Sequence, residues 1–481
     1  MNIAAGSRDE ARINATNTSF ARLITIFCFW KALLLLVAAA SPGPGYDTST
    51  HLLLFSRQIP DTTTVPSWFE YLVLRLTRWD ALYFASASAR GPIFEQQWAF
   101  SPLLAKVTLG LVGVFFSPER RPGIAAYAFA GIAISHISHL LAVLLLFQLA
   151  HEILPASHSR KHQIAFTTAC LHITSPAGLF LSAPYGESAF AMANFGGLLC
   201  YAKAKRSSQS PESNTAVQAV LWTITSGFLL GVATMIRSNG LFNGIIFAWD
   251  AIDCLPGVIG MLQQRNWPAL FSLMGTLSAG MLIASGYVLP QIVAYIEYCT
   301  DGNERPWCST ALPSIYSFVQ SYYWNVGFLR YWTLSNLPLF ALATPMILVL
   351  IGTAYATLDR RQLVHVMDTI SISKRPDSDS AQAQSKALFW NTIPRLALPQ
   401  LILAGLAITT FHVQIVNRIS SGYPVWYLIL AIAMHPEPGA GEVKGRSVIS
   451  LCSRYAEWLV RASVMYAIVQ GGLYASFMPP A

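Results

Sequence analysis

Two short stretches early in the chain hold the residues best suited to chemistry. Asp80 lies beside Arg78 and Trp79, and Glu95 follows shortly before Trp98. A carboxylate can take the proton of an attacking hydroxyl, and an arginine can bind a phosphate through its planar fork. We therefore take Asp80 as the centre of a candidate functional site, with Glu95 as a second carboxylate near it in the sequence.

Further polar residues gather in three later stretches. These residues are Tyr185 and Glu187, then Arg237 and Asn239, then His412, Gln414 and Arg418. Each group also has a purely structural interpretation: Glu187 and Arg237 fit a buried ion pair equally well, and a lone histidine at a helix end is common. Together, carboxylates, arginines and amides without a metal-ligand pattern fit a sugar or phosphate-linked substrate.

The composition identifies the elements that must position these residues. Of 481 residues, 54% are hydrophobic and only 11% are charged, whereas soluble proteins carry roughly 25% charged residues. Repeated apolar runs of about 20 residues predict an all-α polytopic membrane protein. The net charge of +8 fits positively charged cytosolic loops better than nucleic-acid binding. The chain has no Gly-x-Ser-x-Gly elbow, P-loop or Cys-x-x-Cys pair, so familiar soluble-enzyme motifs do not apply.

Charge distribution predicts the topology. Basic residues put the tail 1–19, the segment at 203–206 and a linker loop at 358–387 in the cytosol. Loops 41–100, 299–334 and 413–421 then face the lumen, as does the end of the chain. About twelve apolar segments and an odd number of crossings predict about 11 spans. The segment that does not cross is either 101–116 or part of the region broken at Pro176. We expect a single transmembrane domain over 20–481, with 41–100 as its lumenal catalytic loop.

Two local features of the lumenal loops are predicted. Ser67 and Glu70 have the spacing of a capping box that starts a helix. Apolar residues continue at helical spacing from Trp68 to Tyr83, which predicts an amphipathic helix lying in the interface or packed against the spans. Cys299 and Cys308 share one polar loop and can form a disulfide if it faces an oxidising lumen.

Several stretches together resemble the PIG-V family. The resemblance rests on Arg78-Trp79-Asp80-Ala81, on Glu95 with Trp98-Ala99-Phe100-Ser101-Pro102, and on Ser175-Pro176-Ala177-Gly178 running into Pro184-Tyr185-Gly186-Glu187-Ser188. It also includes Arg237-Ser238-Asn239-Gly240 and His412-Val413-Gln414. It covers nearly the whole chain in the right order, and the Tyr83-Phe84 ending and the loop 358–387 are typical of fungal members.

The resemblance implies a GT-C-like transferase of the endoplasmic reticulum with its site on the lumenal face. It implies transfer of the second mannose, in α-1,6 linkage, from dolichyl-phosphate-mannose to the glycosylphosphatidylinositol (GPI) precursor, with inversion. It also implies a lipid-linked donor and acceptor, a small accessory membrane subunit, and neither a cofactor nor a metal. On this basis Asp80 is the expected base and Glu95 its alternative. Arg237 and Arg418 are the candidate phosphate ligands, without a choice between them.

Three other functions remain open on the sequence alone. A lipid or sugar transporter explains a helix bundle with charged residues, although its polar groups belong near mid-membrane in repeated, broken helices. A non-catalytic subunit of a glycosylation complex is another. A third is a dolichyl-phosphate-sugar transferase with a different acceptor.

Overall fold

The computed structural model describes residues 2–43, 47–55, 67–100, 102–116, 122–155, 160–209, 213–300, 305–370, 380–436 and 447–478. Every regular element in these ranges is helical, which confirms the predicted all-α class. In a bilayer a helix pairs its own backbone N–H and C=O groups, so a hydrophobic chain of this kind folds as a helix bundle.

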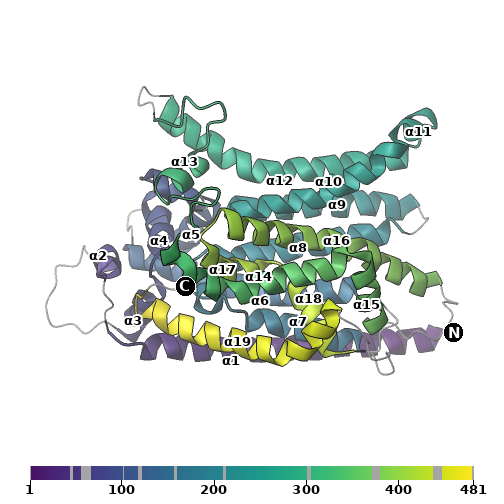
Figure 1. Cartoon of the computed structure of the whole chain (residues 1–481), viewed down its shortest axis with the longest axis horizontal. Coiled ribbons are helices and arrows are strands. Elements are labelled where there is room, and N and C mark those ends of the chain that lie inside the picture. Colours follow the sequence, from purple (N-terminus) through teal and green to yellow (C-terminus); the bar gives the residue numbers. More distant parts are fainter. Residues whose placement is uncertain are drawn as a thin grey trace.

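Eight of the described helices are longer than 20 residues and lie side by side along the long axis of the molecule (Figure 1). They are α1 (Asn2–Ala40), α6 (Ile124–Ile153), α8 (Glu187–Ser207), α9 (Ser213–Ile236), α12 (Trp267–Cys299), α14 (Leu337–Leu358), α16 (Ser380–Thr409) and α19 (Val448–Ala475). Residues 2–19 of the expected tail are thus helical and continuous with the first span.

Seven helical segments in the described ranges are long and apolar enough to cross a membrane. They are Thr16–Ala40, Ile124–Ile153, Thr215–Ile236, Ser238–Gln263, Trp267–Cys299, Leu334–Leu358 and Ala383–Thr409. The chain is therefore an integral membrane protein, while the total of about 11 spans stays a prediction. The marked N- and C-terminal ends lie at opposite ends of the bundle (Figure 1).

Short helices cover the end of the bundle that carries Asp80, which we call the Asp80 end (Figure 1). They are α2 (Ser49–Phe55), α3 (Trp68–Leu76), α4 (Ala81–Arg90), η1 (Glu95–Ala99), α13 (Ile315–Tyr322), η5 (Leu334–Asn336), η6 (Val413–Ile415), α17 (Val416–Ile419) and η7 (Ser420–Gly422). Two further short elements are η2 (Gly178–Leu181), which precedes α8, and η3 (Ser238–Asn243), which follows α9.

The predicted capping box is present, but the helix it starts is shorter than expected. The Ser67 side chain accepts from the backbone N–H of Glu70, and the Glu70 carboxylate accepts from Ser67. Helix α3 ends at Leu76, and the chain bends through 77–80 before α4 begins. The side of α3 that is buried also differs from the expected apolar stripe. Trp68 is 75% exposed while Arg75 is buried, because Arg75 bonds to carbonyl groups of the neighbouring segments.

The structure favours 101–116 as the apolar segment that does not cross. Helix α5 (Pro102–Phe115) has 14 residues, about 21 Å of helix against a hydrocarbon core of about 30 Å. Helix α6 starts beside α3, where the rings of Phe129 and Phe69 lie 4.7 Å apart. Both ends of the α5 segment therefore belong to the Asp80 end. Arg120 and Arg121 lie outside the described residues.

The region around Pro176 forms a buried irregular segment instead of a long helix. Helix α7 (Lys161–Ile173) stops early, and residues 175–191 are almost entirely buried before and into α8. Irregular backbone at membrane depth is tolerated where protein surrounds it. Lys31 supports this segment by donating to Leu181 O and Ser182 Oγ, each at 2.8 Å.

Helices α11 (Val258–Gln263) and α15 (Arg360–Ile370) lie toward the opposite end of the bundle (Figure 1). Helix α10 (Gly244–Cys254) leads toward that end and joins α11 through η4 (Leu255–Gly257), and α18 (Val425–Met434) is a further short helix of the bundle. Helix α15 corrects the expectation of a linker loop from 358 onward. Leu363, Val366 and Ile370 share one helical face and are buried, so packing holds this part in place. Residues 371–379 of the expected linker lie outside the described residues.

Candidate functional site

A cavity of about 260 Å³ opens at the Asp80 end, between segments far apart in the sequence. Its walls come from the turn before α4, η1, the turn before α8, η3, α13 with the segment after it, and the η6–α17 turn. The lining residues are Asp80, Phe84, Ala99, Phe100, Tyr185, Ile236, Arg237, Ser238, Asn239, Tyr316, Gln320, Trp324, Val326, Phe411, His412, Ile415, Arg418 and Ile419.

Four charged residues form one network on the inner wall. Glu187 Oε1 lies 2.7 Å from Arg237 Nη1 and 2.8 Å from Arg418 Nε. Arg418 Nη1 in turn lies 3.2 Å from Asp80 Oδ2. Two arginines therefore balance two carboxylates. The Glu187 side chain is 1% exposed and the Asp80 side chain 36%, so Asp80 is the carboxylate of the network that the cavity can reach.

Arg418 is held in place by two neighbouring aromatic rings as well as by its ion pairs. Its guanidinium carbon lies 4.9 Å from the centre of the Phe180 ring and 5.2 Å from that of Tyr185. Burial alone would lower the pKa of Arg418, but Glu187 and then Asp80 outweigh burial and raise it. Arg418 is therefore a fixed positive charge beside Asp80.

Arg237 occupies a different part of the wall, at the start of η3. Its Nε donates to Asn239 Oδ1 at 3.4 Å, and Asn239 Nδ2 donates to the hydroxyl of Tyr423 at 2.9 Å. The next residue, Ser238, bonds to the hydroxyl of Tyr316 at 2.8 Å. These bonds tie the short motif 237–239 to α13 and to the turn before α18.

Aromatic side chains form another part of the cavity lining. Phe100 contacts Tyr83, Phe84 and Trp324, with ring centres 5.0, 5.2 and 5.5 Å away. His412 stacks on Tyr331 at 4.7 Å, and its Nε2 lies 3.1 Å from Trp324 O. A cavity lined by aromatic side chains and by fixed charges suits an amphipathic substrate.

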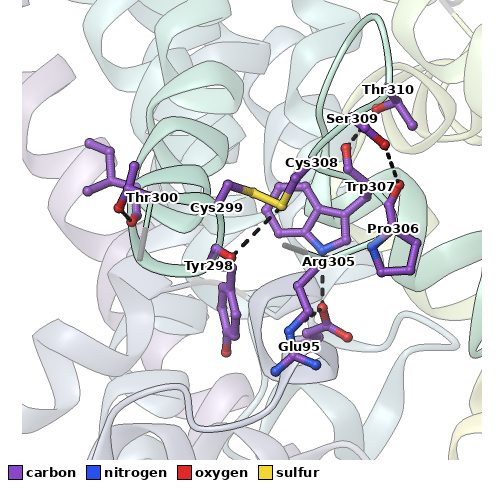
Figure 2. The surroundings of a disulfide bond; sticks show 11 residues. Glu95, Tyr298, Cys299, Thr300, Arg305, Pro306, Trp307, Cys308, Ser309 and Thr310 are labelled. Carbon is purple, nitrogen blue, oxygen red and sulfur yellow. Dashed lines mark hydrogen bonds and ion pairs between the residues drawn. A yellow bond between two sulfur atoms is a disulfide. The ribbon is translucent and has the colours of Figure 1, made fainter. Parts of the chain in front are cut away.

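Glu95 lies apart from the cavity, in a cluster around the disulfide between Cys299 and Cys308 (Figure 2). Its Oε1 accepts from Trp307 Nε1 at 3.1 Å, and its Oε2 accepts from the Tyr323 hydroxyl at 2.9 Å. Partial burial and then the adjacent carboxylate raise the pKa of Tyr323, so its hydroxyl stays a donor. Both Glu95 oxygens are thus occupied. The structure contains the bond between Cys299 and Cys308, which the sequence left open.

The structure separates the sequence-predicted residues into two groups. Asp80, Tyr185, Arg237, Asn239, His412 and Arg418 line the cavity, and Glu187 lies directly behind them. Glu95, Arg78, Trp79, Trp98 and Gln414 are outside the cavity lining. Arg78 and Trp79 pack against the end of α19, and Trp98 is buried near Tyr298. Gln414 follows His412 on η6.

The cavity residues that the sequence prediction missed include Tyr316, Gln320 and Trp324. All come from one side of α13 or from the segment directly after it. The spacing of Tyr316 and Gln320, four residues apart, puts both on one helical face. That signal is weak, because the helix has only eight residues.

This arrangement can perform a displacement reaction. An accessible carboxylate can accept a proton from an attacking hydroxyl, and two fixed arginines can stabilise a leaving anion. Among the described residues, no group of three His, Cys, Asp or Glu side chains is placed to hold a metal ion.

Comparisons with known proteins agree with this chemistry. A family model described as "Mannosyltransferase (PIG-V)" matches residues 20–481. The protein "GPI mannosyltransferase 2" of Chaetomium globosum is 40% identical over 95% of this chain and 96% of its own length. The protein of the same name from Gibberella zeae is 39% identical over 95% and 97%, and that from Aspergillus fumigatus is 36% identical over 95% and 93%.

A comparison with solved structures finds an oligosaccharyltransferase of Archaeoglobus fulgidus. It is 12% identical, with a TM-score of 0.42, and the match covers 94% of this chain but 55% of that one. The family match, in contrast, spans nearly the whole chain and excludes the transporter alternative. This integral membrane protein belongs to the PIG-V family of mannosyltransferases.

Proposed function

We propose that the chain transfers the second mannose, in α-1,6 linkage, from dolichyl-phosphate-mannose to a GPI precursor at the lumenal face of the endoplasmic reticulum. The names of the similar fungal proteins support the GPI acceptor. The observation that carries the proposal is the cavity itself, in which the accessible carboxylate of Asp80 lies beside Arg418, and Glu187 anchors both Arg418 and Arg237.

The reaction is a single displacement. The acceptor hydroxyl oxygen forms a bond to the anomeric carbon, the bond from that carbon to the phosphate oxygen breaks, and the hydroxyl proton passes to Asp80. The β-linked donor then gives an α-linked product, which requires one base and no covalent sugar intermediate. Dolichyl phosphate leaves with the bonding electrons, and Arg237 or Arg418 stabilises its growing charge.

Asp80 suits the base better than Glu95. Asp80 lines the cavity with a side chain that is 36% exposed. Glu95 is 9% exposed and both its oxygens accept hydrogen bonds from the protein. Glu95 instead ties η1 to the segment that supplies Trp324 to the cavity wall.

Two observations support a lumenal position for the Asp80 end. The disulfide of Cys299 and Cys308 lies there, and disulfides persist in oxidising compartments. The basic side chains Lys205, Arg206 and Arg395 lie at the opposite end, in ion pairs with Asp250, Glu152 and Asp253, as the positive-inside rule expects for a cytosolic face.

The proposal also includes a lipid-linked donor and a lipid-linked acceptor. It further includes a small accessory membrane subunit, and it requires no cofactor or metal. Co-purification of the native chain in mild detergent tests the subunit. A chelator in the transfer assay tests the metal, and unchanged mannose transfer is the expected result.

The deciding experiment measures mannose transfer by the purified chain from dolichyl-phosphate-mannose to a GPI precursor carrying one mannose. Asp80→Asn should leave a folded protein whose kcat falls about 10²–10⁴-fold, because a general base contributes a factor of that size. Accumulation of the one-mannose precursor in cells depleted of the chain is the matching result in vivo.

Near-normal transfer by Asp80→Asn would remove Asp80 as the base. Accumulation of a different lipid intermediate in depleted cells would assign another acceptor to the same enzyme. A useful matched control is Asp253→Asn, which changes an exposed carboxylate at the opposite end and should leave kcat unchanged.

A further inference from the structure

The residue before Asp80 has a backbone conformation that its side chain disfavours. Trp79 has a φ of 54°, in the left-handed region where a bulky residue is an outlier. Such a conformation persists only where surrounding contacts over-determine it, and it is common at functional sites. Because Asp80 follows directly, the backbone of Trp79 sets the direction in which the Asp80 carboxylate leaves the chain.

A second unusual backbone lies at the C-terminal end of α19. Phe477 has a φ of 58°, at the position after a helix where glycine is usual. The N–H groups of Phe477 and Met478 bond back to Tyr474 O at 3.0 Å and Leu473 O at 2.9 Å, which is the pattern of a Schellman turn. The Phe477 side chain is nevertheless only 1% exposed, so tertiary contacts explain why a phenylalanine stands there.

The two outliers contact each other. The rings of Trp79 and Phe477 meet edge to face, with centres 5.2 Å apart, and Trp79 Nε1 donates to Met478 O at 3.2 Å. On the other side, the Arg78 guanidinium lies 4.9 Å from the centre of the Phe477 ring. Phe477 thus contacts both residues that precede Asp80.

Tyr474, one turn earlier, holds the backbone of the same segment. Its hydroxyl accepts from Arg78 N at 3.2 Å and donates to Leu76 O at 2.9 Å, with Arg78 O at 3.1 Å as a second acceptor. All of these groups are buried. The bend between α3 and α4 is therefore fixed by a helix end nearly 400 residues away.

We propose that Phe477 and Tyr474 are positioning residues for the transfer reaction. Together they hold Arg78 and Trp79 so that Asp80 faces the cavity, 3.2 Å from Arg418. This inference rests on the proposed function, because it assumes that Asp80 is the base. The end of α19 is then part of the machinery of the site although it does not line the cavity.

Phe477→Gly separates this role from simple helix capping. Glycine adopts the left-handed conformation without strain, so the turn itself should persist or strengthen, while the ring that contacts Arg78 and Trp79 is lost. A small displacement of a reacting group can cost about 10²-fold in rate. We expect kcat to fall roughly 10–100-fold, with the KM for donor and acceptor changed less than about twofold.

Tyr474→Phe provides an independent variant that keeps the packed ring and removes only the hydroxyl. It should show the same split, a lower kcat with nearly unchanged KM values. Met465→Ala is the matched control, since Met465 lies on the exposed side of the same helix, with 66% of its surface accessible. Thermal unfolding in detergent monitors the fold of each variant.

A wild-type kcat in folded Tyr474→Phe and Phe477→Gly overturns the inference, as does a rise in KM alone. If Phe477→Gly does not accumulate as folded protein, the kcat of Tyr474→Phe decides the matter. The proposed function has its own readout. If Asp80→Asn is inactive while both variants at the end of α19 have a wild-type kcat, only the positioning role fails.

Discussion

Glu187 is the residue on which both cavity arginines depend. It is almost fully buried, and one of its oxygens contacts Arg237 and Arg418 together. Breaking a buried ion pair by removing one partner costs about 3–5 kcal/mol, since the other charge stays buried and unpaired. The sequence interpretations of Glu187 as a structural ion pair and as a site residue are therefore compatible, because the pair builds one wall of the cavity.

The two arginines should respond differently to substitution. Arg418 is paired with Asp80 and packs against the rings of Phe180 and Tyr185, so Arg418→Lys should mainly lower kcat. Arg237 has no contact with Asp80 and lines the cavity beside Asn239, so Arg237→Lys should mainly raise the KM for the donor. Loss of a charge-assisted hydrogen bond worth about 1.5–3 kcal/mol predicts a change of roughly 10–100-fold, in kcat for Arg418→Lys and in the donor KM for Arg237→Lys.

Steady-state kinetics on the purified variants check this assignment. For each arginine the Lys and Ala variants should be nearly equal in effect, because lysine lacks the planar fork. Wild-type donor affinity in both Arg237→Ala and Arg418→Ala would remove the arginines as phosphate ligands.

At the scale of elements, the wall of the cavity nearest α13 depends on a cross-connection from η1. Glu95 on η1 accepts hydrogen bonds from Trp307 and Tyr323, on either side of α13, beside the disulfide that closes the loop (Figure 2). Trp324, the neighbour of Tyr323, lines the cavity. One buried carboxylate and one covalent link therefore help to order this wall, together with the hydrogen bond from Ser238 to Tyr316.

Glu95→Gln distinguishes this connecting role from proton transfer. A glutamine can still accept from the Trp307 indole, and its amide can donate to the Tyr323 oxygen once that hydroxyl rotates. We expect kcat to fall less than about fivefold in Glu95→Gln and much more in Glu95→Ala, in which both bonds are lost.

The same transfer assay measures both variants, with thermal unfolding as the check on folding. A loss in Glu95→Gln as large as that in Asp80→Asn would return Glu95 to the role of base, since a general base contributes about 10²–10⁴-fold.

At the scale of the whole molecule, the bundle is assembled by close contact of long helices, and the site is built where they end. Helices α9 and α12 approach closely through small residues, so that a Cβ added to Gly286 would collide with the carbonyl of Gly231. The irregular chain needed for the site is confined to the Asp80 end and to the buried segment before α8. Both lipid-linked substrates can then meet at the edge of the bilayer.

Engineered glycosylation sites test which end faces the lumen. Ser309→Asn with Ala311→Thr creates an acceptor site in the exposed loop after the disulfide, at the Asp80 end. Gln263→Asn with Arg265→Thr creates one at the exposed end of α11, at the opposite end. We expect a glycan on the first variant only, seen as a mobility shift that endoglycosidase reverses. A glycan on the second variant alone would invert the topology and contradict the proposed location of the site.

The sequence by itself determined the helical membrane class, the capping box at Ser67 and the charged residues of the cavity such as Asp80 and Arg418, because hydropathy, cap spacing and short motifs are local properties. It also identified the cysteine pair that forms the disulfide. The tertiary structure decided what depends on contacts between distant segments. It put Glu95 beside the disulfide instead of in the cavity, broke the expected helix at Trp79, and brought α13 and the end of α19 to the site. The physical reason is that packing and hydrogen bonds between residues hundreds of positions apart, such as Tyr474 and Arg78, select a backbone that no local pattern encodes.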